Sequence, residues 1–248
     1  MPTKKPSQNF SNVTYSFSAI GVVHSCFKEK FATPRQSGLV AEATGVIELL
    51  EPFNDPDAVL GLEQFSHLWV QFVFDQSMKT PWRAKVRPPR LGGNAKLGVF
   101  ATRAPVRPNP IGLSVVKLDS VEVKPNQVLL HVSGLDMVEG TPVLDIKPYI
   151  HYADSILNAR SGFADTTPTK LPVVFSSELK ESLTDSCEYN QSLIASILGL
   201  DPRPQYQQFD ESRIYTANIE NVDVSWVYRP TEGDQWQIEV IAVKKLKT

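Results

Sequence analysis

The sequence predicts a mainly β chain in two parts, a barrel or sandwich over residues 15–157 and a small α+β domain over residues 158–248. Short segments rich in aromatic and β-branched residues recur through the first part, separated by proline and glycine turns, which is typical of all-β architectures and not of βαβ units. The only long helical pattern lies in the second part, after a polar stretch at residues 158–169.

The first part contains seven candidate strands and one candidate helix. The strands are expected at residues 15–26, 44–50, 67–75, 97–102, 111–118, 128–132 and 143–149. The helix is expected at residues 55–65, where Asp55 can cap its first turn and Pro56 suits its first position. Residues 1–14 are polar and lack an apolar core, so we expect a disordered tail and no signal peptide.

The second part begins with a candidate strand at residues 172–175 and continues with a helix expected over residues 177–198. Ser177 suits the N-cap of this helix and Gly199 suits its C-terminal cap. Two further strands are expected at residues 218–228 and 235–246, joined by a turn.

The composition is that of an ordinary globular protein, with 42% hydrophobic and 21% charged residues in a chain of 248. The two cysteines, Cys26 and Cys187, form no CxxC pair, and the four histidines lack metal-ligand spacing, so we expect neither a disulfide framework nor a metal site. No apolar run approaches the roughly 20 residues of a membrane helix. The expected compartment is the cytoplasm.

Several enzyme classes are excluded by their missing motifs. The chain has no GxSxG, no HExxH and no GxGxxG motif. The glycines at 93 and 98 have P-loop spacing, but Val99 and Phe100 stand where a P-loop has Lys and Ser or Thr. A serine hydrolase, a zinc protease and a Rossmann nucleotide site are therefore not supported.

Charge is segregated along the chain. Residues 76–118 contain nine cations and no acidic residue, whereas the rest of the chain holds 16 basic and 27 acidic residues. The cations of this acid-free window are Lys79, Arg83, Lys85, Arg87, Arg90, Lys96, Arg103, Arg107 and Lys117. A basic segment on an otherwise acidic protein predicts a polyanionic partner.

Three clusters are candidate functional sites, each with a plainer alternative. In residues 28–36, Arg35 and Gln36 follow Pro34 and could act as rigidly held hydrogen-bond donors. The alternative is that this segment is a solvated hairpin loop. In residues 87–112, prolines fix Arg107 and Asn109, which can bind anions and base edges, or the segment is a solvated basic loop.

The third cluster, residues 135–149, places an acid, a base and a phenol on one face of a strand. These are Asp145, Lys147 and Tyr149. One expectation is that the three side chains line the mouth of a pocket. The alternative is that Asp145 and Lys147 form an ion pair on a solvent-exposed face.

Four segments resemble one family: FKEKFATPRQ, RPPRLGGN, GVFATRAPVRPNPIGLS and LDMVEGTPVLDIKPYI are similar to segments of the TsaA-like (TrmO) family. DPRPQYQ and the terminal hairpin resemble the C-terminal domain of its bacterial branch, so the resemblance covers about residues 15–246. Cys26-Phe27 stands where the family has Pro-Tyr, a departure at a loop position.

The resemblance implies an S-adenosylmethionine-dependent tRNA methyltransferase built on a single-sheet β-barrel. The implied reaction is methylation of N6 of N6-threonylcarbamoyladenosine at position 37, next to the anticodon of threonine tRNA. A homodimer with its site near the subunit interface is also implied. From the residues themselves we expect no membrane and no metal partner.

Carried over residue by residue, the resemblance implies a cofactor site of Pro34, Arg35, Gln36, Asp75, Gln76, Arg103, Leu113, Ser133, Gly134, Leu135 and Asp136. We expect the acceptor side and the catalytic groups to be Arg107, Asn109, Asp145, Lys147 and Tyr149. Asp145 is the first candidate for general base and Asp136 the second, while Arg107 or Lys147 suits the carboxylate of the substrate.

Two other functions remain open on the sequence. A non-catalytic RNA-binding barrel would use the basic window but need no cofactor pocket. A methyltransferase acting on a small molecule would use the pocket but would not need the basic window.

Overall fold

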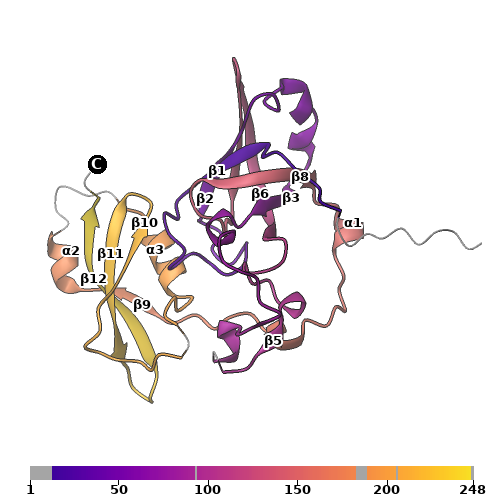
Figure 1. Cartoon of the computed structure of the whole chain (residues 1–248). Helices are drawn as coiled ribbons and strands as arrows, with labels where there is room; N and C mark the ends of the chain where they lie inside the picture. Colours follow the sequence, from indigo (N-terminus) through magenta and orange to yellow (C-terminus); the bar gives the residue numbers. More distant parts are fainter. Residues whose placement is uncertain (1–12, 93, 183–188, 205, 247–248) are drawn as a thin grey trace, which may run out of the picture.

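The computed structural model describes residues 13–92, 94–182, 189–204 and 206–246. Six antiparallel strands close into a barrel in the order β1-β2-β7-β6-β3-β8 (Figure 1). These strands are β1 (Gly21–Ser25), β2 (Thr44–Leu49), β3 (His67–Val73), β6 (Ile111–Lys124), β7 (Gln127–Ser133) and β8 (Thr141–Pro148). A barrel, and not a sandwich, is therefore the architecture of the first part.

Three long connections lie at the same end of this barrel. Neighbouring strands are all antiparallel, so β1, β3 and β7 end where β2, β6 and β8 begin. Residues 26–43, 74–110 and 134–140 therefore meet at that end. The second of them carries β4 (Lys85–Val86), β5 (Leu97–Gly98), η3 (Asp75–Ser77), η4 (Pro89–Leu91) and η5 (Val99–Ala101).

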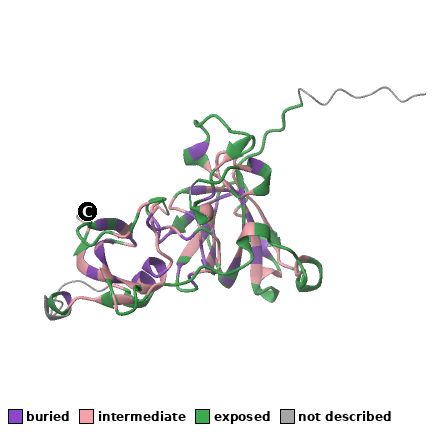
Figure 2. Cartoon of the chain, turned by 90° about the horizontal axis from the view of Figure 1, so that it is seen from below, coloured by how far each residue is buried: buried purple, intermediate pink, exposed green. Residues whose placement is uncertain are grey.

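The barrel interior is a packed core and not a ligand channel. Inward-facing side chains alternate with outward-facing ones along each strand, and Figure 2 shows the buried positions along the strands. Val23, Ile47, Leu68, Val70 and Leu130 are fully buried there. A functional site must therefore lie on the loops or on the outer surface.

A C-terminal unit follows, and it contains a four-stranded sheet in the order β10-β11-β12-β9. Its elements are β9 (Val173–Phe175), α2 (Ser177–Ser182), α3 (Gln191–Leu198), β10 (Tyr215–Ile219), β11 (Val222–Pro230) and β12 (Trp236–Lys245), preceded by α1 (His151–Asp154) and η6 (Gly162–Ala164). Trp226 and Tyr228 are fully buried in it. Figure 1 shows α3 between this sheet and the barrel loops.

The prediction of a single helix over residues 177–198 is wrong. Helix α2 ends at Ser182, and α3 begins anew at Gln191, with residues 183–188 outside the described part. The Asn190 side chain accepts a hydrogen bond from the backbone N of Leu193 (3.0 Å) and so caps α3. Such a side chain competes with the helical backbone, which favours a fresh start at this position.

The N-cap of α2 is also displaced by one residue from the expected Ser177. The Ser176 hydroxyl, and not that of Ser177, accepts from the backbone N of Leu179 at 3.2 Å. Gly199 does follow the last residue of α3, as expected.

The helix expected over residues 55–65 is instead two 3-10 turns, η1 (Pro56–Val59) and η2 (Leu62–Gln64). Gly61 separates them with a φ of 82°, a left-handed conformation that ends a helix. The capping role of Asp55 is confirmed, because its side chain accepts from the backbone N of Asp57.

Three expected strands have different limits. The strand expected at residues 218–228 is two strands, β10 and β11, because Glu220 takes a φ of 54° and turns the chain. The strand expected at residues 15–26 is confined to Gly21–Ser25. The strand expected at residues 97–102 is the two-residue β5, followed by η5.

Residues 1–12 of the expected tail, and Cys187, lie outside the described residues. Within the described part of the chain, no helix is long and apolar enough to cross a membrane.

Candidate active site

Residues from all three connections meet at one end of the barrel. The Arg103 guanidinium donates a hydrogen bond to the side-chain oxygen of Gln36, and the backbone N of Gly38 donates to the carbonyl of Gly134 (2.9 Å). Gly134 has a φ of 74°, and a Cβ at this position would stand 3.4 Å from the Gly38 backbone. Gly38 also has a positive φ (77°), so both loops turn at this contact in a left-handed conformation that side-chain-bearing residues rarely adopt.

Asp136 lies in the same cluster with an unusual environment. Its Oδ1 is shielded from solvent and has no hydrogen-bond partner among the described residues. Burial raises the pKa of Asp136 to about 6, although hydrogen bonds from the Ser114 side chain and the Ser37 backbone, and the charge of Arg103, act in the opposite direction. A shielded acceptor without a donor is costly in a folded protein and suits a ligand that brings a donor.

Five other expected cofactor residues border this cluster. Asp75 and Gln76 form η3, and the Lys30 ammonium donates to the Ser77 hydroxyl at 3.5 Å, so residues 26–43 lie beside η3. Leu135 is fully buried and its backbone N donates to Ala43 (3.2 Å). The Ser133 hydroxyl donates to Asp119 (3.2 Å), and Pro34 is buried in the loop.

The remaining two expected cofactor residues are exposed. Arg35 lies on the surface of the loop, within electrostatic range of Asp201 from the C-terminal unit. Leu113 is 50% exposed on the outer face of β6. The structure therefore brings most of the expected cofactor residues to one end of the barrel but places Leu113 on the barrel wall.

The acceptor candidates on β8 lie on that same wall. Lys147 and Asp145 form an ion pair at 2.5 Å, with side chains 61% and 42% exposed. The ring of Tyr149 packs against those of Trp69 (6.0 Å between centroids) and His67 (6.3 Å). The surface ion pair that we considered as an alternative is thus what this chain shows at Asp145.

The strand register separates these residues from the cofactor cluster. Asp145 pairs with Gln71, which pairs with Leu113, whereas the backbone N of Tyr149 bonds to His67 at the far end of β3. The seven residues of β3 span about 20 Å. Within one chain, Tyr149 and Lys147 therefore do not reach the loops at the cofactor end.

Arg107 and Asn109 lie at the cofactor end itself, in the segment that leads into β6. The Arg107 guanidinium donates to the carbonyls of Thr102 (3.1 Å) and Ala104 (3.4 Å), which folds this side chain back on its own loop. Asn109 is exposed. These two acceptor candidates share an end of the barrel with Gln36, Arg103 and Asp136.

A basic arm, defined here as residues 78–101, extends from the same connection and contains the β4–β5 ribbon (Figure 1). Most of its cationic side chains have no hydrogen bond or ion pair to any described residue; these are Lys79, Arg83, Lys85, Arg87 and Lys96. Arg90 donates to the Thr166 hydroxyl at 3.0 Å. The arm also exposes Trp82 (54%) and Phe100 (77%). Unpaired cations beside exposed rings are the features of a single-stranded nucleic-acid surface.

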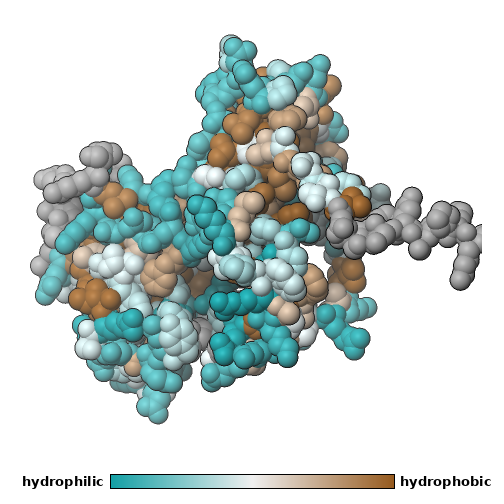
Figure 3. All heavy atoms as spheres, viewed as in Figure 1, coloured by the Kyte–Doolittle hydropathy of each residue, from teal (hydrophilic) through white to brown (hydrophobic). Residues whose placement is uncertain are grey.

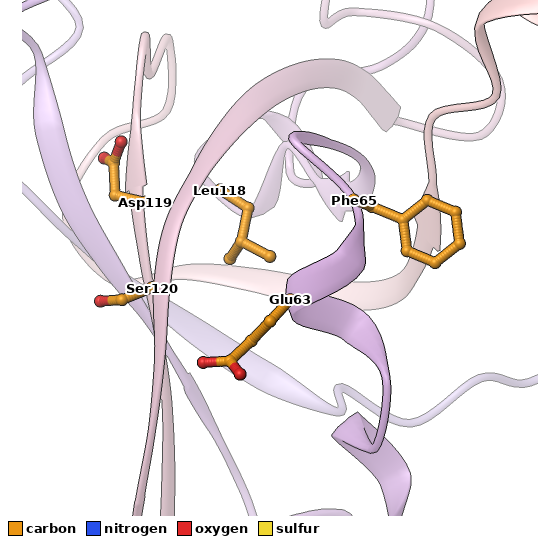
Figure 4. Close-up of a pocket in the computed structure, with 5 residues that line it drawn as sticks. All are labelled: Glu63, Phe65, Leu118, Asp119 and Ser120. Atoms are coloured by element: carbon orange, nitrogen blue, oxygen red, sulfur yellow. The ribbon is translucent and has the colours of Figure 1, made fainter.

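A shallow pocket lies elsewhere, between η2 and β6, and is lined by Glu63, Phe65, Leu118, Asp119 and Ser120 (Figure 4). It includes none of the expected site residues. Among the described residues, no group of His, Cys, Asp and Glu side chains could hold a metal ion.

Sequence patterns missed two residues of the cluster, Ser37 and Ser114. Ser114 is only 4% exposed and occupies an inward position of β6, between Gly112 and Val116. A hydroxyl on the core face of a strand requires a partner, and that was the available signal for Ser114. Ser37 acts through its backbone N–H, which no residue type reveals.

Family models match both parts of the chain. Residues 22–155 match the tRNA-methyltransferase O N-terminal domain, and residues 168–246 match the TrmO C-terminal domain. The chain is 47% identical over 218 residues to a protein of Escherichia coli K12 named tRNA (adenine(37)-N6)-methyltransferase, covering 86% of this chain and 93% of that protein.

A second relative and a solved structure agree with this match. The chain is 46% identical over 220 residues to a Pseudomonas aeruginosa protein named putative S-adenosylmethionine-dependent methyltransferase RcsF, covering 87% and 94% of the two chains. A crystal structure of TrmO from P. aeruginosa superposes with a TM-score of 0.75 at 40% identity, covering 95% of this chain and 99% of that one.

Proposed function

This chain belongs to the tRNA-methyltransferase O family, and we propose that it methylates N6 of N6-threonylcarbamoyladenosine at position 37 of threonine tRNA. It is an S-adenosylmethionine-dependent tRNA methyltransferase. One observation carries the more specific proposal. Gln36, Arg103 and Asp136, far apart in sequence, converge at the end of the barrel from which the acid-free basic arm extends.

The cofactor site that we propose is this convergent cluster together with η3 and Leu113. The unpartnered Oδ1 of Asp136 fits the cofactor, which carries ribose hydroxyls and an ammonium group that can donate to it. S-adenosylmethionine, when bound, supplies a methyl group already activated on a sulfonium. On the cofactor side, the residues of the protein then bind and align it, to which Gln36 and Arg103 contribute as a pre-formed pair.

Acceptor activation is assigned to the outer-wall carboxylate Asp145. The N6 atom is a poor nucleophile because its lone pair is delocalised into the ring and the carbamoyl group. A carboxylate that accepts the N6–H proton assists its attack, and such general base catalysis is worth about 10²–10⁴-fold in rate. Arg107 or Lys147 would hold the threonine carboxylate of the substrate. Asp136 is the second candidate for the base.

A homodimer completes this site in our proposal. Lys147 and Tyr149 lie a strand length from the cofactor cluster of their own chain, so a partner must supply one of the two groups. The wall that carries them exposes Ile111 (42%) and Leu113 (50%), and Figure 3 shows hydrophobic atoms gathered over β6, β3 and β8. An exposed apolar face of this kind indicates an interface, and a twofold dimer pairs the same face of both copies.

The basic arm is the proposed contact to the anticodon loop. Its free cations would meet tRNA phosphates, while Trp82 and Phe100 would stack on unpaired bases. The compartment would be that of mature tRNA, the cytoplasm. We further propose that residues 15–157 and 158–248 are separate domains, of which the first carries the chemistry.

One experiment tests the proposal. S-adenosylmethionine binding is measured by calorimetry, and transfer of labelled methyl is then measured to threonine tRNA with and without the threonylcarbamoyl group. We expect cofactor binding, and transfer only to the modified tRNA. Binding of tRNA without cofactor binding would support an RNA-binding barrel, and equal transfer to both tRNAs would refute the assigned substrate.

A further inference from the structure

The β1–β2 loop, residues 26–43, contacts the C-terminal unit near its start. The backbone N of Glu220 donates to the carbonyl of Cys26 at 2.7 Å, and Phe27 forms a β-bridge with Ile219. The Glu29 carboxylate accepts from the backbone N of Asn218 at 3.0 Å. Strand β10 is an edge strand, so the loop satisfies backbone groups that would otherwise be free.

An aromatic contact follows two residues later. The ring of Phe31 stacks on Trp226 of β11, with centroids 5.9 Å apart and planes inclined by 10°. Trp226 is fully buried and stacks in turn on Tyr215 (5.9 Å). Phe31 therefore packs on a rigid part of the C-terminal sheet, and such ring pairs contribute beyond their buried area.

The far end of the loop is held by a different element. Glu42 accepts hydrogen bonds from the hydroxyls of Ser192 (3.2 Å) and Ser196 (3.1 Å). These serines are four residues apart on α3 and so share one face, the face directed at the barrel loops (Figure 1). Both ends of the loop are thus tied to the C-terminal unit.

The middle of the same loop carries the proposed cofactor residues Pro34, Arg35 and Gln36. Gln36 faces the barrel cluster through Arg103, and Gly38 bonds to Gly134. A loop that is ordered before the ligand arrives avoids the entropy cost of ordering on binding. The hydrogen bonds and the ring contact to the C-terminal unit flank this segment, and Arg35 within it lies in electrostatic range of Asp201.

We propose that the C-terminal unit is a positioning element for the cofactor loop, an inference that rests on the proposed function of Pro34–Gln36. It holds residues 26–43 in the conformation that binds S-adenosylmethionine and takes no part in the transfer step. Weakening the contacts lowers the competent fraction of the loop, and the apparent dissociation constant rises by the inverse of that fraction.

The test uses the full-length protein with the double substitution Ser192→Ala and Ser196→Ala. Alanine is the better helix former, so α3 itself is retained. We expect the dissociation constant for S-adenosylmethionine to rise about threefold to tenfold, as it would if the competent fraction fell to between a third and a tenth. The KM for the cofactor rises with it, while kcat at saturating cofactor and the KM for tRNA stay near wild type.

Phe31→Leu is a second, independent variant. It should likewise raise the dissociation constant for S-adenosylmethionine and leave kcat at saturating cofactor near wild type. The matched control is Thr216→Ala with Ser225→Ala, which removes two hydroxyls of the same sheet that bond to each other at 3.2 Å. The control should bind the cofactor as wild type does.

Three outcomes are distinguishable. Wild-type affinity in both loop-contact variants would overturn the positioning role while leaving the proposed function intact. A fall in kcat with unchanged cofactor affinity would also overturn it, because that is the result of partial unfolding. Absence of cofactor binding by the wild-type protein would instead refute the proposed function itself.

Discussion

At the scale of single residues, the two candidate carboxylates differ in surroundings and so in suitability for each role. Asp136 is shielded, with one oxygen unpartnered and a pKa raised by burial to about 6. Asp145 is exposed and paired with Lys147. A shielded carboxylate suits a fixed ligand contact, whereas an exposed one can exchange its lysine for a substrate proton.

Asp136→Asn should weaken cofactor binding and remove its pH dependence. In the wild-type protein the ionised carboxylate accepts more strongly from the cofactor's donors than the protonated form does, so affinity should fall as the pH is lowered through about 6. Loss of a hydrogen bond to a charged group costs about 1.5–3 kcal/mol, or roughly 10- to 100-fold in affinity at pH 8. Calorimetric titrations from pH 5 to pH 8 check this, and a wild-type affinity that is flat across this range would contradict it.

The same substitution should not destabilise the free protein. The pKa of Asp136 is raised on folding, so its contribution to stability is fully present below its unfolded pKa of 3.8 and is lost as the pH rises through about 6. The neutral asparagine avoids this loss. Urea denaturation at pH 8 should therefore give a free energy of unfolding at or above that of wild type, which separates lost binding from lost folding.

Asp145→Asn should lower the rate of methyl transfer with little change in cofactor affinity. If its carboxylate accepts the N6 proton, single-turnover rates should fall by about 10²–10⁴-fold. Lys147→Gln breaks the same ion pair but keeps the carboxylate, so a smaller loss is expected. Equal losses in the two variants at saturating tRNA would count against Asp145 as the general base.

His24 should make stability fall as the pH rises above 6.5. Its ring bonds Glu48 (2.9 Å) and Glu139 (3.1 Å), and these hydrogen bonds raise the pKa of His24 above 6.5. The stabilisation is fully present below pH 6.5 and is lost as the pH rises through the raised pKa. Because the ring is half exposed, the change should stay within about 1 kcal/mol. The midpoint of thermal unfolding should change less between pH 6 and pH 9 in His24→Gln than in wild type. The same change in both proteins would refute the assignment.

At the scale of elements, the basic arm should show two separable kinds of tRNA contact. Trp82→Ala should weaken tRNA binding by about 1–3 kcal/mol, as loss of one base stack does, without changing the salt dependence. Arg83→Gln should weaken binding and lower the slope of log K against log salt by roughly 0.7, because one phosphate contact is lost. Lys124→Gln, a cation on the β6–β7 hairpin paired with Glu122, is the matched control. A Trp82 variant that alters the slope would contradict the stacking role.

Elements whose pattern is repetitive were predictable, and elements decided by one side chain were not. The alternation along β3 and β7 indicates strands because each buries one face. The restart of α3 depends on a hydrogen bond from Leu193 to Asn190, and the break at Gly61 on one left-handed residue. Neither feature changes the hydrophobic pattern. A prediction based on that pattern therefore gave one continuous helix at each place.

The candidate site also has a part that the sequence could predict and a part that it could not. Gln36 and Arg103 could be singled out by their proline-rich segments and by family resemblance, but their contact depends on which barrel end the loops share. The separation of Tyr149 from that end depends on the pairing of β8 with β3, which local sequence does not specify.

At the scale of the whole molecule, one chain has its candidate groups on two surfaces. The proposed cofactor residues gather at the loop end of the barrel, and the proposed acceptor residues of β8 lie along its wall beside exposed apolar side chains. The C-terminal unit contacts the β1–β2 loop at Cys26–Phe31 and at Glu42. A twofold partner placed on the wall would add its residues to the loop end without disturbing that contact.

Leu113→Glu should therefore dissociate the proposed dimer and abolish methyl transfer together. In a twofold interface the substitution occurs twice, and each copy loses about 1.5–3 kcal/mol of side-chain burial and adds a desolvated charge. The dimer should weaken by at least about 10³-fold, and light scattering at micromolar protein should give the monomer mass. Leu60→Glu, at a leucine 86% exposed on the connection between η1 and η2, is the matched control and should remain dimeric and active. A monomeric wild-type protein with full activity would refute both the dimer and the shared site, because the wall residues would then have to act within their own chain.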